Sequence, residues 1–254
     1  LRYKETEVQG LKFSDKTLEN PIWIYWNKGI DSAPEIVRKC YESVCKYAKQ
    51  EVVLLNDQNL ADYIQLPDYI EQKKTAGQIP MAGYADLMRF ALLAHYGGTW
   101  IDATVYLTNS IPTTITESDF FAVRNSLLLI DNPVLYPAWF LHAKKGNKMI
   151  REIRNVAFAY WLKNEHVIEY LLPNLIITQV IKSEPEAEQA IPYMNSDYSE
   201  YLVKILGDDF SEDKWEWIKD LTGIHKLTYK LENKIDKKGT FYRHIIDGEK
   251  LLCQ

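Results

Sequence analysis

The stretch Gly97-Gly98-Thr99-Trp100-Ile101-Asp102-Ala103-Thr104 is the most informative part of this chain. In the segment before it, Met81 to Tyr96, apolar residues recur at the spacing of one helix face. A glycine pair follows, and glycine readily takes the left-handed conformation that closes a helix. Thr99 to Thr108 is rich in β-branched and aromatic residues, which is typical of a strand. The sequence therefore predicts a helix that ends at the glycine pair, followed at once by a strand.

Asp102 is the unusual residue of the predicted strand, because aspartate is disfavoured inside strands. A buried carboxylate is costly unless a cation or a metal pairs with it. Trp100 lies two positions earlier, so strand alternation places both side chains on one face. In open α/β sheets, ligands bind at the carboxyl ends of the strands. If the strand breaks at Asp102, its carboxylate lies where a ligand would bind.

Asp86 and Arg89 are three residues apart and share one face of the predicted helix. Taken alone, they indicate an ordinary helix ion pair worth a few tenths of a kcal/mol. The pattern Gly-Gly-x-Trp-x-Asp that follows at a short distance favours a functional interpretation instead. We therefore expect Asp86, Arg89 and Asp102 to belong to one site.

The whole stretch from Tyr84 to Thr108 resembles the sugar-nucleotide-binding region of glycosyltransferases with a DXD-type motif, similar to glycosyltransferase family 32, and most closely their capsular polysaccharide synthesis branch. The resemblance implies a GT-A-like α/β fold with a helical acceptor-side extension. It implies that Asp86 contacts ribose or sugar hydroxyls and that Arg89 and Trp100 lie at the donor sugar. It also implies that Trp26 stacks on the nucleotide base, although a tryptophan there is equally expected in the core.

The motif departs from the family pattern at its second acidic position, since the sequence reads Asp102-Ala103-Thr104. The resemblance implies a Mn²⁺ or Mg²⁺ ion at Asp102, with Thr104 at the donor. Both metals prefer oxygen ligands, so one carboxylate with phosphate oxygens and waters suits them. In related retaining transferases a late histidine completes the metal shell and a nearby lysine meets the diphosphate, which points to His225 and Lys230. The alternative for this segment is a surface strand, and His244 is the rival histidine.

Two further sets of residues have both a functional and an ordinary interpretation. Asn125 or Asp131 suits the polar side chain that retaining transferases keep near the donor anomeric carbon, whereas turn chemistry explains Asp131-Asn132-Pro133 equally well. A basic run is either a solvated face or a patch that meets anionic lipid headgroups or a lipid diphosphate acceptor. Its residues are Lys144, Lys145, Lys148, Arg151 and Arg154.

Composition is that of an ordinary globular protein, with 46% hydrophobic and 26% charged residues in 254. The net charge of −5 argues against a general nucleic-acid binder. Cys40, Cys45 and Cys253 fit no disulfide framework or zinc spacing, which favours a reducing compartment. No signal peptide is visible, and Tyr170 to Thr178, the longest apolar stretch, is too short to span a bilayer. These features predict a cytoplasmic protein, with any membrane contact peripheral and at the inner face.

Along the chain, predicted strands and helices alternate, which favours an α/β fold. The predicted strands cover Pro21–Trp26, Glu51–Leu55, Ser118–Arg124 and Pro137–Ala143, besides the one that carries Asp102. The predicted helices cover Ala33–Ala48, Asn147–Lys163 and Glu165–Ser183, with short helices between Leu55 and Lys74. No linker forces two domains, so we expect one domain over 1–254, with a nucleotide-binding half at about 20–110 and an acceptor-facing half at about 111–254.

The resulting functional hypothesis is a retaining glycosyltransferase that moves a hexose from a UDP-sugar to a capsular or surface polysaccharide acceptor, an oligosaccharide or a lipid-linked saccharide. Two alternatives stay open. One is a carbohydrate- or nucleotide-binding protein whose active site has lapsed, for which the missing second aspartate argues. The other is a capsule phosphotransferase that moves a sugar phosphate.

Overall fold

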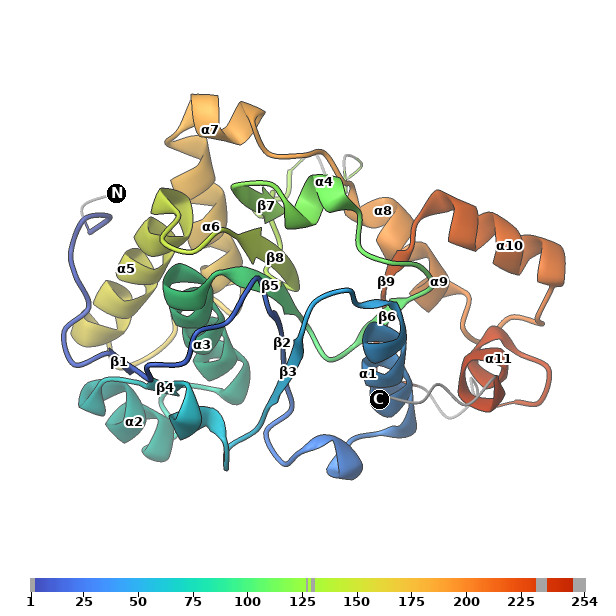
Figure 1. Ribbon diagram of the computed structural model, residues 1–254, viewed down its shortest axis with the longest axis horizontal. Helices are drawn as coiled ribbons and strands as arrows, with labels where there is room; N and C mark the ends of the chain where they lie inside the picture. The colour runs from blue at the N-terminus through green and yellow to red at the C-terminus, as the bar shows by residue number, and fades with distance from the viewer. Residues whose placement is uncertain (1–2, 127, 129–130, 232–236, 249–254) are drawn as a thin grey trace.

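The computed structural model describes residues 3–126, 128, 131–231 and 237–248. A mixed sheet of five strands lies at the centre of the described part (Figure 1). Its spatial order is β3 (Val52–Leu55), β2 (Ile22–Tyr25), β5 (Gly98–Ile101), β8 (Phe140–Ala143) and β7 (Phe120–Ala122). β2 runs parallel to both β3 and β5, whereas β8 is antiparallel to β5 and to β7. This is the mixed α/β architecture, a central sheet with flanking helices, that the sequence predicted.

Helices surround the sheet, and two small antiparallel sheets accompany it. The helices before β7 are η1 (Ile30–Ser32), α1 (Glu35–Tyr47), η2 (Leu60–Asp62), α2 (Asp68–Thr75), α3 (Met81–Tyr96) and α4 (Thr113–Thr116). Those after β8 are α5 (Lys148–Lys163), α6 (Leu172–Lys182), α7 (Pro185–Gln189), α8 (Ser196–Ser199), α9 (Tyr201–Lys204), α10 (Glu212–Leu221) and α11 (Phe241–Asp247). The small sheets pair β1 (Lys12–Phe13) with β4 (Ile64–Gln65) and β6 (Val105–Leu107) with β9 (Ile224–Lys226).

Strand alternation divides the core between the two faces of the central sheet. Trp23 and Tyr25 of β2 belong to a large cluster with α3, α5 and α6, which lie together on one side (Figure 1). Ile22 and Ile24 of the same strand point the other way and pack with Val44 of α1. Because both faces are covered, all four residues of β2 are buried. The last part of the chain, with α9, α10, α11 and β9, packs against the far side of α1 and β6.

The glycine pair closes α3 and starts β5 as the sequence predicted. Gly97 follows the last helical residue with a φ of 75°, and its N–H donates to the carbonyl of Leu93. Gly98 has a φ of 97°, and a Cβ there would lie 2.1 Å from the carbonyl oxygen of Pro21. That oxygen accepts the N–H of Thr99 at 2.8 Å, so it belongs to the pairing of β2 with β5. Only glycine therefore fits position 98.

Substituting Gly98→Ala is expected to lower the free energy of unfolding by about 3 kcal/mol or more, because it combines a left-handed backbone with a backbone clash. The matched control is Gly146→Ala, where φ is also positive at 72° but no atom lies within 4 Å of the added Cβ. The control should lose only about 1 kcal/mol. Denaturant unfolding followed by tryptophan fluorescence measures both values. Equal losses in the two variants would show that the contact with Pro21 is not what matters.

The structure corrects one predicted helix, divides one predicted strand and adds helices that the sequence did not predict. The predicted helix over Glu165–Ser183 begins only at Leu172, because residues 164–171 form an irregular segment that the Tyr160 hydroxyl holds through the backbone of His166 and Ile168. The strand predicted over Thr99–Thr108 breaks after Ile101, which meets the condition that the sequence set for Asp102, and resumes as β6. The sequence did not predict the short helices between 185 and 247. The division into two functional halves stays a prediction.

Within the described ranges, the chain contains no helix whose length and hydropathy would let it cross a bilayer.

Candidate functional site

The candidate site lies at the carboxyl ends of the parallel strands, where β2 and β5 stop. After Ile101 the chain turns: the N–H of Asp102 donates to the carbonyl of Trp139 at 2.9 Å, and the N–H of Val105 donates back to the carbonyl of Asp102 at 2.9 Å. The turn takes Asp102 out of the β5–β8 ladder and leaves 28% of its side chain exposed. Asp102 therefore has the position at the strand end that the sequence predicted for it.

Arg89 connects Asp86 with Asp102, the two carboxylates with which the sequence predicted it to share a site. Its Nη1 lies 2.9 Å from Oδ1 of Asp86, one helical turn earlier on α3, and donates to the carbonyl of Ala138 at 2.7 Å. Its Nη2 donates to Oδ1 of Asp102 at 2.9 Å. The guanidinium lies 4.9 Å from the ring of Trp100, within the range of a cation–π contact. Arg89 is 6% exposed, so α3 holds a nearly buried fork between two carboxylates.

Lys226 contacts the opposite side of Asp102. Its Nζ donates to Oδ2 of Asp102 at 2.9 Å and to the hydroxyl of Thr104 at 2.7 Å. The indole N–H of Trp100 adds a 3.1 Å bond to Oδ1, which confirms that Trp100 and Asp102 project to one side. Lys226 is the last residue of β9 and pairs with Val105 of β6. A residue 124 positions away in the chain thus completes the environment of Asp102.

The pKa values of the two carboxylates beside Arg89 are shifted in opposite directions. Burial raises the pKa of Asp86 from its ordinary value of 3.8 to about 6, although the nearby Arg89 charge works against that rise. Burial also acts to raise the pKa of Asp102, but the charges of Lys226 and Arg89 outweigh it and lower the pKa below its usual range. Asp102 is consequently ionised throughout the neutral range, whereas Asp86 gains a proton in mildly acidic solution.

The Asp86 shift predicts how stability depends on pH. Because the pKa of Asp86 is raised from 3.8 to about 6 on folding, the folded protein keeps this proton in a window where the unfolded chain releases it. The resulting stabilisation is complete below pH 3.8 and is lost as the pH rises through 6. Relative to Asp86→Asn, the unfolding free energy of the unsubstituted protein should fall by about 3 kcal/mol across this window. Denaturant titrations at several pH values test this, with the exposed Asp131→Asn as control; a flat difference for Asp86→Asn would contradict it.

These charged residues form part of the wall of a cavity of about 350 Å³. Aromatic side chains make up much of the remaining wall, among them Trp26, Trp139 and Tyr170. Trp26 lies just after β2 and meets the edge of Tyr229, with ring centroids 5.5 Å apart. Tyr170 is 71% exposed, so it stands at the mouth of the cavity. The cavity has the size of a small-molecule site and combines apolar surface with a few fixed charges.

Several residues that the sequence proposed lie away from this cavity. His225 is fully buried, bonds the hydroxyl of Thr108 through Nε2 at 2.9 Å, and has a pKa lowered to about 4 by burial. It precedes Lys226 on β9, so strand alternation turns it to the opposite face. Lys230 is exposed beyond β9, and His244 stacks on Phe210 with centroids 3.8 Å apart. None of these three residues is among those that line the cavity.

The polar residues proposed for the anomeric carbon also lie outside the cavity wall. The Asn125 amide donates to the carbonyl of Val134 at 2.9 Å, and its side-chain oxygen accepts the N–H of Ser126, which makes it part of a loop. Asp131 is exposed in a turn. The turn at Asp131 suits the alternative given for Asp131-Asn132-Pro133, and the role of either residue at the anomeric carbon stays a prediction.

A divalent metal ion does not fit the residues around Asp102 as they lie. Oδ1 of Asp102 already accepts from Arg89 and Trp100, and Oδ2 accepts from Lys226. Over the residues that the structure describes, no three His, Cys, Asp or Glu side chains come together as a metal-binding group. The predicted Mn²⁺ or Mg²⁺ ion therefore stays a prediction, and Asp102, the carboxylate predicted to bind it, has its oxygens engaged with Arg89, Trp100 and Lys226.

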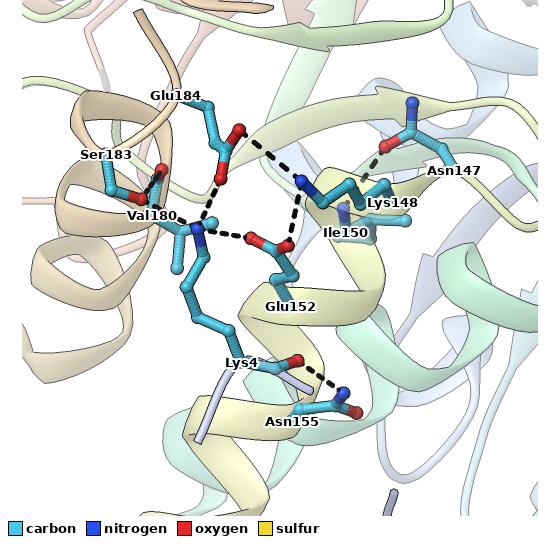
Figure 2. A network of polar contacts seen from close by, with 9 residues as sticks. All are labelled: Lys4, Asn147, Lys148, Ile150, Glu152, Asn155, Val180, Ser183 and Glu184. Carbon is cyan, nitrogen blue, oxygen red and sulfur yellow. Dashed lines mark hydrogen bonds and ion pairs between the residues drawn. The ribbon is translucent and has the colours of Figure 1, made fainter. Parts of the chain in front are cut away.

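The basic run beside β8 and on α5 is largely engaged within the protein. Figure 2 shows Lys148 between two carboxylates, with Nζ 3.5 Å from Glu152 and 3.4 Å from Glu184. Lys4, from the segment before β1, lies 2.7 Å from Glu152 and 2.6 Å from Glu184 in the same network. Lys144 pairs with Asp119 at 2.7 Å, and Arg154 donates to Asn155. Contact of this run with anionic headgroups or a lipid diphosphate stays a prediction.

The sequence analysis did not select Lys226, although this lysine lies between His225 and Lys230, which it did select. The signal that would have found it is the two-residue period of a strand, since only one of His225 and Lys226 can face Asp102. The aromatic residues Trp139, Tyr170 and Tyr229 were also missed, because the segments that bring them to the cavity are far apart in the sequence. No local pattern connects them to Asp102.

Comparisons with known proteins add a family and a set of distant structural neighbours. A family model described as "Capsular polysaccharide synthesis protein" matches residues 2–245. The chain is similar to a solved structure titled "PaToxG Glycosyltransferase", with 12% identity, a TM-score of 0.47, and coverage of 70% of this chain and 74% of that one. It is also similar to the glycosyltransferase GlyE of Streptococcus pneumoniae TIGR4 in its apo form, with 14% identity, a TM-score of 0.44, and coverage of 83% and 55%. The chain thus spans about half of GlyE. No curated protein matches the chain.

Proposed function

The chain belongs to the capsular polysaccharide synthesis protein family, and on that premise we propose that it is a glycosyltransferase that takes a hexose from a UDP-sugar. One observation supports this proposal most directly: the Arg89 guanidinium contacts both Asp86 and Asp102. These residues lie at the strand ends and line a cavity of about 350 Å³. Ligands of α/β sheets bind at this edge. Fixed carboxylates and cations side by side suit a ligand that carries both hydroxyl groups and phosphates.

In this proposal the donor lies along the cavity wall, with its base toward Trp26 and its sugar toward Arg89 and Trp100. Trp26 is half-buried and has an aromatic neighbour in Tyr229, an arrangement that suits stacking on a flat base. The Asp86 carboxylate accepts hydrogen bonds from ribose or sugar hydroxyls. Arg89 has one fixed orientation because Ala138 and both carboxylates hold it. A donor would therefore meet groups that need no rearrangement.

The transfer step consists of one bond broken, one bond formed and one proton moved. The bond from the anomeric carbon to the β-phosphate oxygen breaks, and the acceptor hydroxyl oxygen bonds to that carbon. The acceptor proton passes to the departing phosphate oxygen, which leaves UDP and the glycosylated acceptor. We propose that attack comes from the face that the phosphate leaves, so the anomeric configuration is retained. The work of the protein is to hold the phosphates and stabilise the charge that develops on them.

The acceptor in this proposal is a surface polysaccharide precursor, either an oligosaccharide or a lipid-linked saccharide, used at the inner face of the membrane. The irregular segment between α5 and α6 borders the cavity through Val167, Tyr170 and Leu171. Tyr170 and Leu171 are 71% and 39% exposed, so apolar surface lies at the entrance where an acceptor would arrive. Sugar rings pack well on such surfaces, because their C–H faces are apolar.

The experiment that tests the proposal is UDP release from a panel of UDP-hexoses, with oligosaccharide acceptors, comparing the unsubstituted protein with Arg89→Lys. Lysine keeps the charge but cannot bridge Ala138 and two carboxylates at once. We expect turnover of one donor, reduced about 100-fold or more in Arg89→Lys. UDP binding without any turnover would favour a lapsed binding protein, and donor phosphate in the product would favour a phosphotransferase.

A further inference from the structure

Lys226 occupies the point where the two ends of the Asp102-Ala103-Thr104 motif converge. Its ammonium lies 2.9 Å from Oδ2 of Asp102 and 2.7 Å from the hydroxyl of Thr104. These two residues stand at the spacing of the paired acidic positions that hold a metal ion in the resembled family. Here a carboxylate and a neutral hydroxyl hold an ammonium group in that place. The side chain of Lys226 is 22% exposed and borders the cavity, so the cation is fixed but accessible.

The charged side chains that line the cavity balance one another without any added ion. Asp86 and Asp102 supply two carboxylates, and Arg89 and Lys226 supply two cations, all connected by contacts of 2.9 Å. A divalent ion at Oδ2 of Asp102 would lie beside the ammonium of Lys226, and like charges that close repel strongly away from bulk water. Threonine at position 104 accepts from the ammonium without adding a negative charge. Substituting a second carboxylate there would suit a dication, whereas the hydroxyl suits a lysine.

We propose that Lys226 is the cation that binds the donor diphosphate, and that it does so in place of a divalent metal ion. The proposal rests on the proposed function, since it concerns the same donor. Lysine is a natural phosphate partner, and its ammonium has three donors, of which two have partners in the described part of the chain. As the bond between the anomeric carbon and the phosphate breaks, Lys226 stabilises the charge that grows on the departing oxygen. The acceptor proton then passes to that oxygen, as described above.

Direct Mn²⁺ binding tests the metal half of the proposal without any need for activity. Mn²⁺ is titrated into the protein and the free ion is followed by electron paramagnetic resonance, for the unsubstituted chain and for Asp102→Asn. The expected result is no binding that depends on Asp102. A stoichiometric Mn²⁺ site that Asp102→Asn removes would overturn the proposal.

Diphosphate binding in EDTA tests the lysine half. UDP, GDP and inorganic pyrophosphate are titrated calorimetrically into the unsubstituted protein and three variants. Lys226→Met keeps the length of the side chain without its charge, and Lys226→Arg keeps the charge. Lys219→Gln is the matched control, because Lys219 also forms an ion pair, 2.6 Å from Glu216, but on the surface of α10. We expect Lys226→Met to weaken binding about 10- to 100-fold, Lys226→Arg to recover most of the loss, and Lys219→Gln to change nothing.

The Mn²⁺ titration and the diphosphate titration together distinguish a failure of this inference from a failure of the proposed function. Binding that requires Mn²⁺, or that Lys226→Met leaves intact, would overturn the role of Lys226 while leaving the transferase in place. Binding of GDP or pyrophosphate but not UDP, with the expected loss in Lys226→Met, would support Lys226 and reject a UDP donor. If none of the three ligands bound the unsubstituted protein, with or without Mn²⁺, both the donor site and the role of Lys226 would be rejected.

Discussion

Substituting Arg89→Met is expected to lower the free energy of unfolding by about 3–5 kcal/mol, because it removes the cation shared by two largely buried carboxylates. Asp86 and Asp102 keep only 15% and 28% of their side-chain surface exposed. Without the guanidinium, Asp86 would lose its ion-pair partner, and the carbonyl of Ala138 would lose its 2.7 Å donor. Methionine fills much of the volume, so the cost comes from uncompensated polar groups rather than from a cavity.

Denaturant unfolding at pH 7 measures this loss, with Arg154→Met as the matched control. Arg154 is a half-buried arginine of α5 whose side chain donates to Asn155, and its replacement leaves no buried carboxylate behind. The double variant Arg89→Met/Asp86→Asn should recover part of the stability, because the uncompensated charge is removed together with its partner. If Arg89→Met lost less than the control, the electrostatic account of this cluster would have to be given up.

The part of the site that the sequence predicted is the part encoded in one continuous segment. Three features there have local causes. Helical periodicity explains the helix over Met81–Tyr96, and positive φ angles explain the glycine pair. The low strand propensity of aspartate explains the break at Asp102. Asp86 and Arg89 follow from that helix, because residues three apart share a face. The prediction that a helix begins at Glu165 was wrong, also for a local reason. The Tyr160 hydroxyl bonds the backbone of His166 and Ile168, and such a contact leaves no periodic pattern in the sequence.

The part that the sequence did not predict depends on pairing between distant segments. Lys226 reaches Asp102 only because β9 pairs with β6, and the register Val105↔Lys226 determines which side chain faces the site. Shifting that register by one residue would exchange His225 and Lys226 between the two faces. The choice of His225 and Lys230 came from the resemblance, whereas the residue of this segment that contacts Asp102 is Lys226. The network of Lys4 with Glu152 and Glu184 was equally out of reach, because it joins segments about 150 to 180 residues apart.

Asp102→Asn is expected to reduce transferase turnover about 100- to 1000-fold, the size of effect seen when one fixed electrostatic group is removed from an active site. Asparagine keeps the shape of the side chain but removes the charge that pairs with Arg89 and Lys226 at 2.9 Å each. Arg89 retains Asp86, so its orientation is largely preserved. Lys226 retains only the Thr104 hydroxyl and gains freedom to leave its position. The main damage should therefore fall on the placement of the lysine ammonium.

The initial rate of UDP release measures this effect, with Asp119→Asn as control, since Asp119 also pairs with a lysine, Lys144, at 2.7 Å but on the exposed surface. If Asp102 acts through Lys226, the double variant Asp102→Asn/Lys226→Met should be hardly slower than the slower of the two single variants. Additive losses would mean that Asp102 contacts the donor itself, as a ligand of its ribose or of an ion. Turnover of Asp102→Asn within threefold of the unsubstituted protein would remove Asp102 from the machinery altogether. The double variant thus distinguishes a carboxylate that positions a cation from one that binds the substrate.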